Sequence, residues 1–582
     1  MSLTAPAGSF GTFPEHVADL ISQALRLFAF EYRGKAVRVD SMRLRGGGKS
    51  AAVDHARGIH YEPVLAYRHG EPRIGLFVDL FTHVLASFSF YCRGEPVEVD
   101  GVRLVNLAQW SRYRFDSLLS NLSPITSVCS ARCLFCYRAG SLNGRLLGLS
   151  PRILGVDEAR TRARYWQPDT KLGLPFHRSD LGEPFANRRI FDILDIARHR
   201  DADSPFTLST NGDYLDRDTV RRLSAYQPLV IALSLNTADL AKRSEVMRPL
   251  NAENGARAPD LLREAAIPYV GSIAADQRLG LADIERTIRY LDERGALMIR
   301  VLLPGYTKYS ADRALPGLDQ WWRQVTELVL AVRKTVESPV LASPALYWDT
   351  ETAPTIEGLH KQSIAKRAGL RIGDVVLAVN GIRVLTKAEV IRLLERSHAA
   401  GRPCRMRVKR GDEVFDTVLR AGPGDDRCEP AGLESELSNG RYGIFMNRGL
   451  DLDSLAWIRS YLNRFKRSVR ALMFSTPLAQ PHLLRLAEYL KDFGRGHDLR
   501  TTIAEHAFWG GNIQIGDLHV VGDYVQKIDR LVRKGWRPDL VFIPSSFLTG
   551  GWGFDVAGSS YRRIETETGV QTVLVPVTRI ME

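Results

Sequence analysis

Between residues 117 and 335, short apolar runs alternate with segments in which apolar and charged residues follow a helical spacing. The runs that predict buried strands are 207–212, 229–236, 267–275 and 297–305. The segment 281–295 predicts one of the amphipathic helices between them. This alternation is typical of a parallel sheet covered by helices, either an open doubly wound sheet or a barrel. In both folds the chemistry lies at the carboxyl ends of the strands.

The first part of the chain repeats itself. Residues 19–44 and 79–104 align without a gap, at an offset of 79 − 19 = 60. Each copy predicts a short helix, a strand that ends at an Arg-Gly turn, and a second strand with alternating valines. We expect a pseudo-symmetric α+β module, which serves either as a scaffold or self-association unit or as a binding unit for a substrate or partner.

A different pattern begins after residue 350. Residues 362–384 predict a short helix, a Gly373-Asp374 turn, a strand and an Asn380-Gly381 hairpin turn. This order resembles a PDZ domain of the bacterial type. Further along, strand-bearing segments of an α/β domain are expected at 471–477, 501–520 and 539–548, with Trp509–Asn512 as a tight turn between strands.

Three of the chain's six cysteines, Cys129, Cys133 and Cys136, lie within eight positions. A structural zinc ion takes four protein ligands, and a fourth ligand here would have to come from far along the chain, since the nearest downstream histidine is His177. An iron–sulfur cluster held by three cysteines leaves one iron open for a small molecule. The remaining cysteines are isolated and predict buried apolar positions: Cys92, Cys404 and Cys428.

With Phe135 before its last cysteine, the triplet reads C-x-x-x-C-x-aromatic-C. This motif resembles the signature of the radical S-adenosylmethionine (SAM) superfamily. The resemblance implies a partial (β/α) barrel in which Cys129, Cys133 and Cys136 are the catalytic, metal-binding residues that hold a [4Fe–4S] cluster. It also implies that SAM binds the open iron and is cleaved to a 5′-deoxyadenosyl radical, which abstracts hydrogen from a substrate.

The resemblance extends to strand ends behind the cysteines. Gly182-Glu183-Pro184 resembles the family's Gly-Gly-Glu-Pro element, with Leu181 in place of the first glycine, and implies that Glu183 accepts hydrogen bonds from the SAM ammonium. Ser209-Thr210-Asn211 resembles the Thr-Asn-Gly end of the third strand, and Ser234 with Asn236 resembles a polar pair near the ribose or carboxylate. The implied cofactor-binding residues are Phe135, Tyr137, Gly182, Glu183, Pro184, Ser209, Thr210, Asn211, Ser234 and Asn236.

The C-terminal segment AFWGGNIQIGDL, followed by VFIPSSFL, resembles a C-terminal domain of unknown function, type 512, that is found beside radical SAM and PDZ modules. That family usually places the PDZ module first, whereas here it follows the barrel. We expect four units: a duplicated α+β module at 1–115, the partial barrel at 116–335, a PDZ-like β-rich module at 350–425 and an α/β domain at 430–582.

The leading interpretation is therefore a radical SAM enzyme with a single cluster, SAM as cofactor and a one-electron donor such as a flavodoxin or ferredoxin. PDZ modules bind peptide C-termini by strand addition, which suggests a peptide or protein substrate, although the module is equally compatible with an internal spacer or a dimer contact. Candidates for the substrate cavity are His177, His506 and Trp509. The alternative is a non-catalytic iron–sulfur scaffold or redox sensor that uses the PDZ module to bind a partner.

Composition and charge argue against several other classes of protein. The formal net charge is +13, but the sequence has no long basic run and no stripe of basic and aromatic residues, so nucleic-acid binding is not expected. The chain starts without a basic segment and apolar run of the secretory kind, and no apolar run approaches the roughly 20 residues that span a bilayer. These features predict a cytoplasmic protein.

Overall fold

The computed structural model describes the chain in segments. Described are the strand residues 29–32, 35–38, 98–99 and 102–103, and then 122, 125–136, 153–165, 182–203, 206–308, 316–343, 353–360, 363–420, 441–446, 452–480, 496–514, 516–544, 547, 555, 559 and 561–575. Several residues named above lie outside the described residues: Cys92, Tyr137, His177, Leu181 and Cys428.

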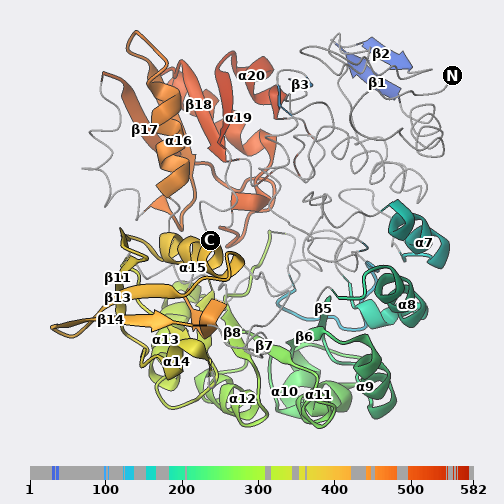
Figure 1. Cartoon of the computed structure of the whole chain (residues 1–582). Coiled ribbons are helices and arrows are strands. Elements are labelled where there is room, and N and C mark those ends of the chain that lie inside the picture. Colours follow the sequence, from blue (N-terminus) through green and yellow to red (C-terminus); the bar gives the residue numbers. More distant parts are fainter. Residues whose placement is uncertain are drawn as a thin grey trace, which may run out of the picture.

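A five-stranded parallel sheet forms the centre of the first described unit (Figure 1). Its strands follow each other in chain order, namely β5 Phe206–Thr210, β6 Leu229–Ser234, β7 Tyr269–Ala274, β8 Met298–Leu302 and β9 Val340–Ser343. The four apolar runs thus form neighbouring strands, as the sequence predicts. The fifth strand, β9, was not among the predicted runs.

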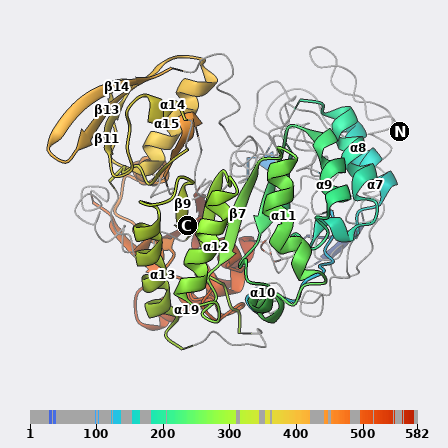
Figure 2. The ribbon, with the colours of Figure 1, turned by 90° about the horizontal axis from the view of Figure 1, so that it is seen from below.

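Helices connect the strands and cover one face of the sheet (Figure 2). They are α7 Val156–Tyr165, α8 Ile190–Arg200, α9 Arg217–Leu223, α10 Leu240–Val246, α11 Ala252–Glu264, α12 Leu281–Glu293 and α13 Leu318–Val332. Side chains of Asp216, Asp239 and Asn251 accept hydrogen bonds from backbone amides in the first turns of α9, α10 and α11. These caps satisfy amides that the helices leave unpaired, and so fix where each helix begins.

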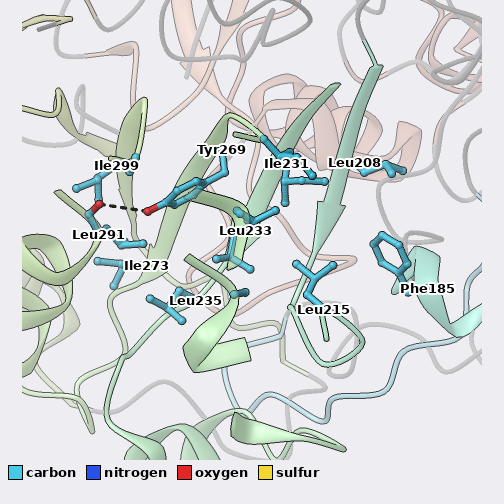
Figure 3. Packing of buried hydrophobic residues seen from close by; sticks show 14 of the residues in the cluster. Phe185, Leu208, Leu215, Ile231, Leu233, Leu235, Tyr269, Ile273, Leu291 and Ile299 are labelled. Atoms are coloured by element: carbon cyan, nitrogen blue, oxygen red, sulfur yellow. Dashed lines mark hydrogen bonds between the residues drawn. The ribbon is translucent and has the colours of Figure 1, made fainter. Parts of the chain in front are cut away.

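Alternate strand residues form the core between sheet and helices (Figure 3). Ile273 and Ile299 lie beside Leu291 of α12, and the hydroxyl of Tyr269 donates to the Leu291 carbonyl at 3.2 Å. Each fully buried aliphatic side chain contributes about 1.5–3 kcal/mol. The face of the sheet that packs against the helices therefore contributes strongly to the stability of this domain.

The PDZ-like module follows as a small antiparallel sheet in the order β12-β11-β13-β14. Its elements are α14 Ile364–Arg367, β11 Val375–Val379, β12 Ile382–Arg383, α15 Lys387–Ala399, β13 Cys404–Arg410 and β14 Glu413–Leu419. Asn380 and Gly381 have positive φ angles between β11 and β12, as the predicted hairpin turn requires. Before this sheet, β10 Gly358–Leu359 pairs with the later strand β15 Ile444–Phe445.

A second parallel sheet, in the order β17-β16-β18-β19, forms the C-terminal unit. Its elements are α16 Leu452–Leu462, β16 Arg470–Ser475, β17 Asp498–Ile503, α19 Val521–Arg533, β18 Leu540–Pro544, α20 Arg562–Thr568 and β19 Gln571–Val575. One prediction is wrong: in the predicted strand-bearing segment 501–520 only the end of β17 is a strand, and Trp509–Asn512 leads to a 3-10 turn and α19 rather than to a second strand. The glycines at 510 and 511 both adopt positive φ, which breaks the extended backbone.

The N-terminal repeat is described only in part. β1 Ala29–Tyr32 pairs antiparallel with β2 Lys35–Arg38, so the two strands predicted for the first copy are present, while Arg33 and Gly34 lie outside the described residues. In the second copy the described strands are β3 Glu98–Val99 and β4 Val102–Arg103, which pair antiparallel with each other, while Arg93 and Gly94 lie outside the described residues. The predicted helices of both copies lie outside the described residues. Among the described helices, none is both long enough and apolar enough to cross a membrane.

Candidate functional site

The loop that carries the three cysteines is tied to the carboxyl end of α10. The amides of Arg132 and Leu134 donate to the carbonyls of Met247 and Val246, at 2.9 and 2.8 Å. Cys133 and Phe135 pack against the main core, and the amide of Cys136 donates to the Cys133 carbonyl at 3.1 Å. The loop is thus held from both its backbone and its apolar side chains.

Gly182 brings the predicted Gly-Glu-Pro element against the start of this loop. Its amide donates to Thr126 O at 2.8 Å, and the amide of Glu183 donates to Val128 O at 2.8 Å. A Cβ atom at Gly182 would lie 2.1 Å from Val128 O. Only glycine allows this approach, so the element requires Gly182 even though Leu181 replaces the family's other glycine.

The Glu183 side chain is buried, with 2% exposure, at the end of β5. Its Oε1 accepts from the Thr210 hydroxyl at 2.7 Å and from the Phe185 amide at 3.4 Å, and its Oε2 accepts from the Asn211 amide at 2.7 Å. Burial raises the pKa of Glu183 to about 7, and these three hydrogen bonds oppose the rise. A buried carboxyl with this pKa is poised to meet a cation.

Asn211 connects that carboxyl to the cysteine loop. Its side-chain amide donates to Ser130 Oγ at 3.0 Å and lies 3.8 Å from Cys129 Sγ, while its backbone amide binds Glu183. The following Gly212 has a φ of +85°, and a Cβ there would lie 2.9 Å from the Cα of Gly255. The turn after β5 therefore holds Asn211 between the cysteine loop and Glu183.

The other predicted strand-end residues differ in burial and in hydrogen bonding. Ser209 is exposed and Ser234 is half-buried, and both lie near the carboxyl ends of β5 and β6. Asn236 is buried and fully engaged: its Oδ1 accepts from the Ala274 amide at 2.7 Å, and its Nδ2 donates to Ser234 O at 3.2 Å. In this structure Asn236 joins the ends of β6 and β7, and so it positions the strand ends.

Sequence reasoning missed Arg243, which is completely buried on α10. Its guanidinium donates to the carbonyls of Asn211 and Leu235, and lies 3.8 Å from the buried carboxylate of Asp213. Burial lowers the pKa of Arg243, and the Asp213 charge opposes this. In the sequence Arg243 is one of two adjacent basic residues on a helix, and nothing marks which of them points inward.

The Cys133 sulfur lies in surroundings that disfavour a free thiolate. Burial, followed by the neighbouring Cys136 and Cys129, raises the pKa of Cys133 well above its usual range. Three thiolates in one loop need a positively charged group to offset their repulsion, and an iron–sulfur cluster provides one. The three cysteine sulfurs therefore suit the attachment of a cluster at three points. Asn211 contacts both Cys129 and the Glu183 carboxyl, and so it connects the sulfurs to that carboxyl.

Two further polar groups line up at the ends of β7 and β8. The Tyr306 hydroxyl donates to Asp276 Oδ2 at 2.5 Å, and Arg278 pairs with the same oxygen at 2.9 Å. On the sheet itself, Arg300 donates to Ser272 Oγ at 3.0 and 3.2 Å. These groups extend the row of polar side chains at the carboxyl edge from β5 to β8, and Asp276, Tyr306 and Ser272 among them are buried.

The C-terminal domain contacts this edge through the turn at Trp509–Asn512. Asn512 donates from its backbone to Tyr306 O and from its side chain to Pro304 O, and its Oδ1 accepts from the Tyr306 amide, at 3.0, 2.9 and 2.6 Å. A Cβ at Gly511 would lie 1.8 Å from Tyr306 O. Of the candidates for the substrate cavity, Trp509 is buried in a small core, and His506 stacks on His519 with ring centroids 3.6 Å apart.

Comparisons with known proteins agree with this geometry. Residues 123–291 match the family model of the Radical SAM superfamily, and residues 355–410 match that of a PDZ domain. Members of the first family use a [4Fe–4S] cluster and SAM. Neither match reaches the C-terminal domain, so its resemblance to the domain of type 512 stays a prediction. No curated protein matches the chain in sequence.

Among solved structures, Streptococcus suis SuiB bound to S-adenosylmethionine is similar at 17% identity and a TM-score of 0.30, over 38% of this chain and 48% of that one. The FeFe-hydrogenase maturase HydG from Carboxydothermus hydrogenoformans is similar at 12% identity and a TM-score of 0.29, over 46% and 69%. This chain thus spans about half the length of SuiB. At such TM-scores these structures add nothing about the function of this chain.

Proposed function

Residues 123–291 form a radical SAM domain, and from this premise we propose that the chain is an enzyme that uses a [4Fe–4S] cluster and SAM to abstract hydrogen from a substrate. Cys129, Cys133 and Cys136 would hold the cluster. When bound, the cluster supplies the electron that cleaves SAM to methionine and a 5′-deoxyadenosyl radical. The residues of this chain would bind and orient the reactants.

The buried Glu183 carboxyl is the observation that carries this proposal. A cluster that only stabilised the loop or sensed redox state would need no buried carboxyl beside it. Glu183 is held by Thr210 and Asn211 at 2.7 Å, and Asn211 also contacts the cysteine loop. A carboxyl with a pKa near 7 gives up its proton readily when an ammonium group arrives, so Glu183 would accept the SAM ammonium as a charge-assisted partner.

The hydrogen bonds around Glu183 support this role. The Arg243 guanidinium donates to the carbonyls of Asn211 and Leu235, and so it holds the turn after β5 in place. Thr210 contributes its hydroxyl to both Glu183 and the Gly212 amide, at 2.7 and 3.0 Å. The carboxyl is therefore preorganised before any ligand binds, which lowers the cost of binding SAM.

A SAM titration of the anaerobically reconstituted full chain tests the proposal. We expect Glu183→Gln to weaken SAM binding by roughly 10-fold or more, because an uncharged amide replaces a desolvated charge partner, while iron content stays at the wild-type level. The matched control is Glu285→Gln on the exposed side of α12, which should bind SAM like the wild type. A wild-type protein that assembles the cluster without binding SAM would instead support the scaffold or redox-sensor alternative.

We propose a flavodoxin or ferredoxin as the class of electron donor, since cleavage of SAM requires one electron. For the substrate class, the PDZ module suggests a peptide or protein and is equally compatible with an internal spacer or a dimer contact.

A further inference from the structure

A buried ion pair lies beside the attachment point of the cysteine loop. The side chains of Arg243 and Asp213 are both completely buried, and Nη2 of the first lies 3.8 Å from Oδ1 of the second. The Met247 amide donates to the Arg243 carbonyl at 2.9 Å, and the Met247 carbonyl accepts from the amide of Arg132 at 2.9 Å. The backbone of Arg243 is therefore about one helical turn from the residue that precedes Cys133 in the loop.

The guanidinium group itself also approaches the loop. It donates to the carbonyl of Asn211, whose side-chain amide donates to Ser130 Oγ at 3.0 Å and lies 3.8 Å from Cys129 Sγ. Its Nη1 lies 3.1 Å from the sulfur of Met247. A single residue thus separates the positive charge of Arg243 from the cysteine loop on each of two sides.

The two charges of the pair do not neutralise each other through a direct hydrogen bond. Arg243 donates to the carbonyls of Asn211 and Leu235, and Asp213 Oδ2 accepts from the Leu250 amide at 2.9 Å. Within the described part of the chain, Nε of Arg243 and Oδ1 of Asp213 have no hydrogen-bond partner. Since a guanidinium stays protonated in proteins, a positive charge is fixed here in surroundings that screen it weakly.

The field of this pair reaches the sulfur of Cys133. Burial raises the pKa of that thiol most, and the neighbouring cysteines raise it further. The Arg243 charge opposes this rise, while Asp213 adds to it by a smaller amount. At Cys133 the arginine is therefore the stronger partner, and the pair as a whole favours negative charge on the sulfur.

A fixed charge beside an iron–sulfur cluster changes the reduction potential of the cluster. Reduction by one electron makes the cluster more negative by one unit of charge. A nearby cation therefore stabilises the reduced form more than the oxidised form and raises the potential, whereas a nearby carboxylate lowers it.

We propose that Arg243 and Asp213 tune the reduction potential of the cluster, with Arg243 raising it and Asp213 limiting the rise. The inference rests on the proposed function, because it requires a cluster on the three cysteines. A higher potential makes it easier for a one-electron donor to reduce the cluster, but leaves less driving force for passing the electron on to SAM. Two opposite charges close to the loop set the balance between these two requirements.

Substitutions that remove one charge at a time separate this role from mere support of the loop. We expect Arg243→Gln to lower the equilibrium constant for reduction roughly tenfold, which is 59 mV for a one-electron couple. Asp213→Asn, which keeps the shape of the side chain, should raise that constant roughly threefold or more. A pair that only supported the loop would not move the potential in opposite directions.

Two further variants serve as controls. Arg243→Lys keeps the charge but loses the fork of donors, so its potential should stay close to that of the wild type. Lys242→Gln removes a positive charge from the adjacent position of α10. The Lys242 side chain is partly exposed and donates to the Leu279 carbonyl, away from the loop, so its removal should shift the constant less than twofold.

The measurement is a redox titration of the anaerobically reconstituted full chain, without SAM, using dithionite and mediators and following the paramagnetic signal of the reduced cluster. Opposite shifts in Arg243→Gln and Asp213→Asn are the expected result. Unchanged potentials, shifts in the same direction, or loss of the cluster in both variants would overturn the inference. A wild type that assembles no cluster would contradict the proposed function instead, and so the two failures are distinguishable.

Discussion

At the scale of single residues, the ionisation of Glu183 should have a large effect on the stability of the fold. Its pKa is about 7 in the folded chain and 4.5 is its ordinary value, so between these pH values the folded protein holds a proton that the unfolded chain releases. Stability therefore falls as pH rises through this window, by about 3 kcal/mol for a shift of this size. Above pH 7 the folded protein carries the full penalty of a buried carboxylate.

Glu183→Gln should remove this dependence. In the cluster-free protein, the free energy of unfolding of the wild type relative to Glu183→Gln should drop by about 3 kcal/mol from pH 4 to pH 8. Urea unfolding followed by hydrogen exchange of β5 and β6 peptides measures it for this domain alone. A difference between the two proteins that is independent of pH would mean that Glu183 is already ionised in the fold.

The residues of the site were recoverable from the sequence to different degrees. The resemblance to the radical SAM family implied that the cysteines, Glu183 and Asn211 meet at one edge of the sheet, and the structure brings them together. Arg243 could not be predicted, since its burial depends on space that Gly255 leaves on a neighbouring helix, where a Cβ would lie 2.0 Å from its guanidinium.

At the scale of elements, the approach of the Gly-Glu-Pro segment to the cysteine loop decides whether the loop can hold a cluster. Gly182→Ala would place a Cβ 2.1 Å from Val128 O, so the loop must move away from Glu183. We expect reconstituted iron content to fall several-fold while the circular dichroism of the chain is unchanged. Gly155→Ala is the matched control, because a Cβ there meets nothing within 4 Å. Full iron loading in Gly182→Ala would show that this approach is unnecessary.

Strand positions were predictable where a strand is buried on both faces. β6 and β7, with nearly every residue buried, coincide with apolar runs. The structure of the segment after β17 was not predictable. Ile513 and His519 look like strand positions in the sequence, but Ile513 packs in a small core and His519 is buried beside α19. Their alternation reflects burial by tertiary contacts, which a local pattern does not distinguish from a strand.

At the scale of the whole molecule, Asn512 fastens the C-terminal domain to the carboxyl edge of the barrel with three hydrogen bonds. Asn512→Ala removes two of them and leaves the Tyr306 amide and the Pro304 carbonyl without these partners. We expect hydrogen exchange of residues 304–308 to speed up at least 10-fold, which corresponds to the roughly 1.4 kcal/mol that such losses cost. Asn463→Ala, at an exposed position after α16, should leave that exchange unchanged. Unchanged exchange in Asn512→Ala would mean that the contact does not hold this segment.

No sequence pattern predicted how the units meet. Two residues make these contacts, and both are ordinary in sequence: Asn512 at the carboxyl edge, and Phe445, which packs among residues at the amino ends of the strands. Glycines allow the close approach in each case, since a Cβ would lie 1.8 Å from Tyr306 O at Gly511 and 2.8 Å from Pro339 at Gly358. The two ends of the barrel are therefore contacted by segments that follow it by more than a hundred residues. This arrangement makes the later domains part of the barrel's environment and not independent attachments.

The central claim is that this chain cleaves SAM. The most direct measurement is the formation of 5′-deoxyadenosine after anaerobic reconstitution with iron and sulfide and reduction by dithionite in the presence of SAM. We predict that 5′-deoxyadenosine forms with the wild type and is lost with Cys136→Ala. If the wild type assembles its cluster but yields none, or if Cys136→Ala yields as much as the wild type, the claim is contradicted.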